Sequence, residues 1–336
     1  TEGYGGMICA SWLDRPLSIA GRVMVKDNNT YQTRLLRFDQ DLVLIPNVAI
    51  HMNRSVNDGY AYNKQIDMLP LIGGQAYQSG DLKKMIAKEL QVDVEDIYGS
   101  DLYLYNRMQP TIWGAHDEFI SSPRLDDLQC AYTSLQGFLK GHHSQTIQVF
   151  ACFDNEEVGS STKQGAASTF LYDTLYRIHH HLFQDDEDFY RAVASSFMLS
   201  GDNAHAVHPN HPEKTDQQNG VYMNQGIVVK SHAGQKYTSD ALSIAVLKDL
   251  CEKAGVPLQF FANRSDMLGG STLGNIAMSQ VSMNCVDIGL AQLAMHSSYE
   301  TAGIKDSYDM IKVMEEFYNS HIQVVKDGYV IVDKEG

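Results

Sequence analysis

Carboxylates and histidines stand at several points of the sequence where an apolar run ends. Asp154, Glu156 and Glu157 follow the apolar run 146–153. Sites in open α/β sheets form at the carboxyl ends of strands, so one glutamate can bind a metal while its neighbour takes a proton from an activated water. The alternative interpretation is an acidic turn exposed to solvent, because Asp and Glu are common in loops.

Two further segments place an acid or a histidine beside an apolar pattern. Asp126 and Asp127 come just before an apolar helix, where either residue also suits the N-cap of that helix. His296 ends an apolar stretch and is either a metal ligand or a structural histidine. Both segments therefore keep a metal-binding and a structural interpretation.

A histidine-rich segment follows the apolar strand expected at 196–199. Three histidines at regular spacing suggest a metal site, but Pro209 and Pro212 exclude the helix that would align them. Asp202, directly after the strand, is at least as good a ligand. The three histidines are His205, His208 and His211.

The elements that must position these groups fall into two parts. Residues 18–47 alternate in the manner of β-strands, a helix is expected at 81–90, and we place a domain boundary near Trp113. Beyond this boundary strands alternate with helices, which favours an α/β layer sandwich around a largely parallel sheet.

Apolar periodicity predicts the helices and strands of the second part. Helices are expected after Pro123, after Ser160 and at 308–322, each with an apolar stripe directed at a core. Buried strands are expected at 146–153 and 284–290. The stripe of the second helix includes Ala167, and that of the third consists of Ile311, Met314 and Phe317.

Composition and charge exclude several classes of protein. The 336 residues carry 41 acidic and 26 basic side chains, and the net charge of −15 repels nucleic acid and anionic membrane surfaces. No apolar run is long enough to cross a bilayer. Five isolated cysteines without a Cys-x-x-Cys pair indicate a reducing compartment, so we expect a cytoplasmic protein.

Taken together, these segments resemble the M18 family of metallopeptidases, the aspartyl aminopeptidase family. The resemblance is specific and covers nearly the whole chain, and it implies an enzyme that removes amino-terminal residues from peptides. The matching segments are Tyr4–Gly6, Trp12–Leu17, Ala20–Val23, Ile45–His51, Pro123–Asp126, Asp154–Ser160, His205–Asn210 and Gln292–Ser297.

The resemblance implies a dinuclear zinc centre. Asp126 would bridge the two ions, with Glu157 and His296 completing the first ion. Asp202 would serve the second ion, and Glu156 would be the general base. Two zinc ions polarise the scissile carbonyl, lower the pKa of a bridging water and hold the free amine of the substrate. Manganese or cobalt suits similar ligands.

The resemblance also implies substrate contacts and an assembly. Lys230 matches a lysine of the substrate pocket, which favours Asp or Glu as the first residue of the peptide. His205 and Tyr237 match further substrate contacts. His51 matches a histidine that one subunit lends to its neighbour, so we expect a dimer-based homo-oligomer. Family members form tetrahedral dodecamers.

For the fold, the resemblance implies an α/β three-layer sandwich of the zinc-peptidase type (phosphorylase/hydrolase-like) at 113–336 and a β-rich dimerisation domain at 1–112. The family has a further zinc ligand, a histidine in a His-x-Asp motif upstream of Tyr4, and this sequence begins after that point. We therefore expect the N-terminal part to be missing and the second zinc site to lack one ligand. The alternatives are a non-catalytic assembly subunit with an incomplete metal site and a dinuclear zinc N-deacylase.

Overall fold

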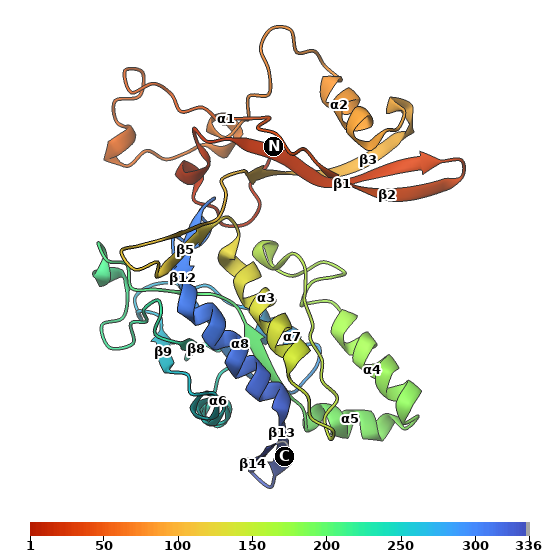
Figure 1. Cartoon of the computed structure of the whole chain (residues 1–336), viewed down its shortest axis with the longest axis vertical. Coiled ribbons are helices and arrows are strands. Elements are labelled where there is room, and N and C mark those ends of the chain that lie inside the picture. Colours follow the sequence, from red (N-terminus) through yellow and green to blue (C-terminus); the bar gives the residue numbers. More distant parts are fainter. Residues whose placement is uncertain (334–336) are drawn as a thin grey trace. The chain divides into compact units, whose positions relative to one another are not determined.

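The structure is a computed structural model that describes residues 1–333, drawn in Figure 1. It contains two compact units. The first comprises Thr1–Gln109 together with Ser297–Tyr299, and the second comprises the rest of the described chain. The functional division at 112/113 stays a prediction. No helix of residues 1–333 combines the length and apolarity needed to cross a membrane.

A three-stranded antiparallel sheet of order β2-β1-β3 lies in the first unit. Strands β1 and β2 are joined by the two-residue turn Asn28-Asn29, in which Asn28 adopts a φ of 54°. Asparagine tolerates this left-handed conformation, which the hairpin turn requires. Helix α2 (Asp81–Leu90) coincides with the helix expected at 81–90 and buries Ile86 and Ala87. The other elements are η1 (Cys9–Trp12), β1 (Leu17–Asp27), β2 (Thr30–Arg37), η2 (Val56–Asp58), α1 (Lys64–Asp67), η3 (Val94–Asp96) and β3 (Ile97–Asn106).

A four-stranded sheet of order β6-β10-β8-β9 lies in the second unit. Strand β10 is parallel to β6 and antiparallel to β8, and β8 is parallel to β9. The apolar strands expected at 196–199 and 284–290 are thus confirmed. Val228 and Val286 are fully buried, as expected for strands covered on both faces. The four strands are β6 (Phe197–Gly201), β8 (Ile227–Ser231), β9 (Leu258–Ala262) and β10 (Asn284–Gly289).

A second sheet of this unit has the order β4-β5-β12-β11-β7 and is mostly antiparallel, so the unit as a whole is mixed rather than largely parallel. Strands β6 and β7 follow each other along the chain with a gap of two residues, and β10 and β11 with a gap of one. The carboxyl ends of β6 and β10 therefore run directly into this second sheet. Its strands are β4 (Thr111–Trp113), β5 (Phe119–Ser122), β7 (Ala204–His205), β11 (Ala291–Leu293) and β12 (Glu300–Gly303).

Helices α3 and α8 run side by side in the second unit (Figure 1). They approach so closely that a Cβ atom at Gly137 of α3 would collide with Met314 of α8. The helix expected at 308–322 corresponds to α8, which begins at Ile304 and ends at Asn319, so residues 320–322 lie outside the helix. Its most deeply buried apolar residues are Met310 and Val313, whereas Ile311 and Phe317 are only half-buried. The helices of the unit are α3 (Leu125–Lys140), α4 (Phe170–Leu182), α5 (Asp186–Ala194), α6 (Ala241–Ala254), α7 (Leu273–Met278) and α8 (Ile304–Asn319).

Two sequence-based predictions for this unit are wrong. Residues 146–153 do not form a strand, because no described strand pairs with them, and Ile147 remains 58% exposed. The helix expected after Ser160 begins only at Phe170, so Ala167 precedes it. The remaining elements are η4 (Glu156–Val158), η5 (Pro212–Lys214), β13 (Ser320–Val325) and β14 (Gly328–Asp333).

Candidate metal centre

Asp126 lies at the start of helix α3, shortly after the end of strand β5. The N-cap of α3 is Arg124, whose φ of 60° is left-handed, and Asp126 and Asp127 have non-helical backbone angles with a cis peptide bond between them. Neither aspartate is the N-cap, so the structural interpretation of this segment is wrong. The backbone N–H of Asp126 donates to Glu300, which leaves the carboxylate of Asp126 directed at other groups.

Glu156 and Glu157 occupy a single 3₁₀ turn after residues 146–153. The turn starts at Asn155, whose φ is 62°, and whose amide oxygen accepts hydrogen bonds from the side chains of Thr162 and Gln164. This fixed turn presents two neighbouring glutamates in different directions. Glu157 approaches Asp126 and His296, as described next.

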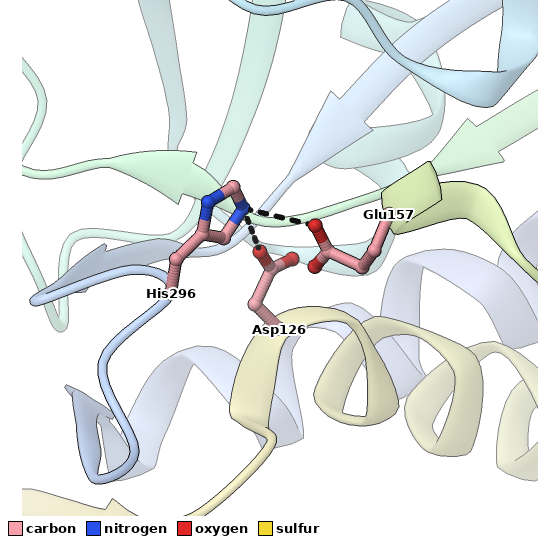
Figure 2. Close-up of side chains that lie close together, drawn as sticks. All are labelled: Asp126, Glu157 and His296. Carbon is pink, nitrogen blue, oxygen red and sulfur yellow. Dashed lines mark ion pairs between the residues drawn. The ribbon is translucent and has the colours of Figure 1, made fainter. Parts of the chain in front are cut away.

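His296 lies in the connection between β11 and β12, with a φ of 65°. Its Nε2 atom is 3.3 Å from an oxygen of Asp126 and 3.3 Å from an oxygen of Glu157. Figure 2 shows the three side chains converging from three separate parts of the chain. Sequence positions 126, 157 and 296 thus meet at one point, and each offers one ligand atom within 4.8 Å of the others.

The spacing of these atoms fits a zinc ion. Two ligand atoms bound to one tetrahedral zinc at about 2.1 Å lie about 3.4 Å apart. The separations of 3.3 Å from His296 to Asp126 and to Glu157 match this value. One nitrogen and two carboxylate oxygens are also the donor types of catalytic zinc sites, which leave a coordination position open.

A second group of three carboxylates shares Asp126 with the first. Asp126, Asp127 and Asp202 offer ligand atoms that lie within 4.8 Å of one another. Asp202 lies between β6 and β7, where the sheets meet, and its backbone N–H donates to Ile288. One oxygen of Asp127 is buried without a hydrogen-bond partner among the described residues. A cation would neutralise this concentration of negative charge.

Lys230 supplies positive charge beside the second group. Its ammonium lies 3.1 Å from an oxygen of Asp202 and 5.7 Å from the ring centroid of Tyr237, and the residue is only 2% exposed. Burial lowers the pKa of Lys230, but the carboxylates of Asp202 and Asp287 outweigh burial and raise this pKa above the ordinary lysine value. Lys230 is therefore charged, and its charge is directed at Asp202.

The crowding of carboxylates shifts their proton affinities. Burial raises the pKa of Glu156 to about 7, and the nearby charges of Asp202 and Glu157 act in the same direction. Burial also raises the pKa of Asp202 to about 6, although Lys230 opposes the shift. The pKa of Asp127 is raised well above its usual range, first by burial and then by Asp202 and Asp126. Such shifts are typical of functional sites.

Other residues singled out from the sequence are not in these two groups. His205 ends β7, opposite Gln292 of β11, and Tyr237 is buried with its ring beside Lys230. His51 is exposed in a loop of the first unit. His208 and His211 lie in an exposed loop with their rings 5.2 Å apart.

The family model described as aminopeptidase I zinc metalloprotease (M18) matches residues 1–318 of this chain. The chain belongs to the M18 family. A probable M18 family aminopeptidase 2 of Clostridium novyi is 48% identical over 324 residues, covering 95% of this chain and 75% of that protein. The corresponding protein of Clostridium acetobutylicum is 49% identical with the same coverage.

Solved structures of M18 aminopeptidases share the fold. Ape4, in its complex with Nbr1, matches with a TM-score of 0.88 at 33% identity, covering 94% of this chain and 65% of Ape4. The mApe1 dodecamer of S. cerevisiae matches with a TM-score of 0.76 at 25% identity, covering 94% of this chain and 71% of that chain. This M18 chain is thus a metallo-aminopeptidase by family, with an α/β fold as the sequence predicts.

Two residues of the M18 chain's centre were missed from the sequence. Asp127 is absent from the ligand set that the resemblance implies, although it forms an acidic dipeptide with Asp126 in the sequence. Glu300 is not among the candidate site residues that the sequence suggests. Its carboxylate is 2% exposed and accepts backbone N–H groups from both Asp126 and His296. No periodicity in the sequence marks a contact between positions 126 and 300.

Proposed function

We propose that this M18 chain removes amino-terminal residues from peptides at a dinuclear zinc centre. The observation that carries the proposal is that two groups of potential metal ligands share Asp126. Asp126, Glu157 and His296 would hold one ion, and Asp202 would hold the second with Asp126. Manganese or cobalt would suit similar donors.

When bound, zinc would supply a Lewis acid that polarises the peptide carbonyl and lowers the pKa of water. Proton transfer would be carried out by a side chain of the protein. Glu156 stands beside the candidate ligand Glu157, and its carboxylate would accept a proton from the attacking water and deliver it to the departing amine. Burial and the charge of Asp202 raise the pKa of Glu156 to about 7 in the chain without bound ions. A general base suits this step when its pKa lies near the working pH.

The chain's residues would also select the substrate. Lys230 places a buried positive charge beside the centre, and such a charge favours a peptide that begins with Asp or Glu. Tyr237 contacts this ammonium, and His205 would line the same pocket. Since Lys230 already pairs with Asp202, an acidic substrate would share the ammonium with that carboxylate.

Removing the metal tests the proposed chemistry. We expect that dialysis against a strong zinc chelator abolishes hydrolysis of chromogenic aminoacyl substrates and that added zinc restores it, because no described side chain replaces the Lewis acid. The same preparation is then given peptides with a free and with an acetylated amino terminus. Faster cleavage of the acetylated peptides would overturn the aminopeptidase proposal in favour of an N-deacylase. An inactive chain that binds fewer than two zinc ions would favour an assembly subunit with an incomplete metal site.

Replacing Lys230 with methionine tests the acidic preference. A hydrogen bond to a charged group contributes about 1.5–3 kcal/mol, so we expect turnover of an aspartyl substrate to fall about 10- to 100-fold more than that of a leucyl substrate. Lys236→Met is the matched control, because the Lys236 ammonium donates to the carbonyl of Gly269 instead. Equal losses on both substrates, with the zinc content unchanged, would contradict the preference.

We also propose that the chain works as a cytoplasmic homo-oligomer built from dimers, as large as a tetrahedral dodecamer. Support comes from the similar mApe1 dodecamer of S. cerevisiae. The exposed loop that carries His51 fits a role at a neighbouring subunit's site. The five cysteines are free, which suits a reducing compartment.

A further inference from the structure

Glu300 is a buried carboxylate that the proposed reaction does not use. It is the first residue of β12, and its backbone lies opposite Ser122, the last residue of β5. Asp126 follows β5 by four residues, and His296 precedes β12 by four. The side chain of Glu300 therefore sits where the two connections that carry these candidate ligands come together.

Both oxygens of Glu300 are used by those connections. One accepts the backbone N–H of Asp126 at 2.9 Å, and the other accepts the backbone N–H of His296 at 2.7 Å. Two N–H donors require two acceptor oxygens. A glutamine has the same length but would turn an NH₂ group toward one of the N–H donors, so only a carboxylate satisfies both.

The two connections that carry Asp126 and His296 have backbone angles that hydrogen bonds to Glu300 would stabilise. Arg124 and His296 adopt φ angles of 60° and 65°, a left-handed conformation that costs free energy in residues other than glycine. A hydrogen bond to a charged acceptor offsets that cost. Without it, each connection is free to relax toward ordinary backbone angles, which would move the side chains of Asp126 and His296 apart.

We propose that Glu300 is a positioning residue that clamps the backbones of Asp126 and His296 and so sets the separation of their side chains for the metal. The 3.3 Å between His296 Nε2 and the Asp126 oxygen is the distance that this clamp would maintain. The inference rests on the proposed metal centre. It adds to that centre a residue that touches neither the metal nor the substrate.

Zinc affinity of Glu300→Gln, measured by competition with a chromogenic chelator, tests the clamp. Loss of a group that orients a metal ligand lowers metal affinity about 10- to 100-fold, and we expect the zinc affinity of Glu300→Gln to fall by this factor. Asp306→Asn is the matched control. Asp306 is fully buried in α8 and likewise accepts two backbone N–H groups, from Asn224 and Gly226, but belongs to neither ligand group.

The two variants separate a positioning role from a structural one. Both are expected to lower the melting temperature, but only Glu300→Gln should lower zinc affinity. Unchanged affinity in Glu300→Gln, or an equal fall in Asp306→Asn, would overturn the clamp. If Glu300→Gln does not fold, Glu300→Asp takes its place: it keeps both oxygens but is one methylene too short to reach both connections, so the same fall is expected. A wild-type chain without zinc would refute the metal centre itself.

Discussion

Replacing Asp126 with asparagine should remove zinc from both halves of the centre and lower peptide hydrolysis by at least about a thousandfold. Asp126 is the residue shared by the two ligand groups, and an amide offers one oxygen where the carboxylate offers two. Loss of the Lewis acid removes several kcal/mol of transition-state stabilisation, and each 1.36 kcal/mol is about tenfold in rate. Elemental analysis and initial rates on the purified variant measure both effects.

The control for this variant is Asp249→Asn. Asp249 forms a surface ion pair with Lys253 on α6, so the substitution removes the same charge outside both ligand groups. We expect wild-type zinc content and rates from it. If Asp126→Asn retained two zinc ions per chain while folding normally, a bridging role for Asp126 would be refuted.

The second large effect is expected from Glu156→Gln, which should retain zinc yet lose turnover. Glutamine keeps the length of the side chain but cannot accept the proton, and general-base catalysis is worth about 10²- to 10⁴-fold. The neighbouring substitution Glu157→Gln is the sharpest comparison. Glu157 lies 3.3 Å from His296 within a ligand group, so its replacement should lower the zinc content as well as the rate.

This pair of adjacent glutamates distinguishes a base from a ligand. We expect opposite zinc contents from the same chemical change at two consecutive positions. A Glu156→Gln chain that turned over at the wild-type rate would exclude Glu156 as the base. Equal zinc loss in both variants would mean that the two glutamates share one role.

Local pattern was sufficient for some of the regular elements of the fold. Helix α2 has the bounds expected from its sequence, and β10 coincides with the apolar run at 284–290, because each buries its own apolar face. Residues 146–153 have an equally apolar pattern but no described pairing partner. Hydrogen bonding between strands is not a local property, so apolarity alone did not decide the structure of this segment.

The residues of the candidate metal site were likewise not predictable from local sequence pattern alone. The sequence brought Asp126, Glu157, Asp202 and His296 together only through resemblance to a family, and the structure places all four in two groups that share Asp126. The sequence did not indicate the backbone conformation at these residues. Arg124 and His296 have left-handed backbone angles, and the backbone N–H groups of Asp126 and His296 donate to Glu300, a residue distant from Asp126 along the chain. The N-cap interpretation of Asp126 and Asp127 failed for this reason.

The most direct test of the account is the zinc content per chain of the purified wild-type protein, measured beside its hydrolysis of aspartyl and leucyl chromogenic substrates. For the proposed dinuclear centre we expect two zinc ions per chain and turnover that depends on them. A chain that binds no zinc when zinc is supplied, or that hydrolyses these substrates equally well after zinc is removed, would contradict it.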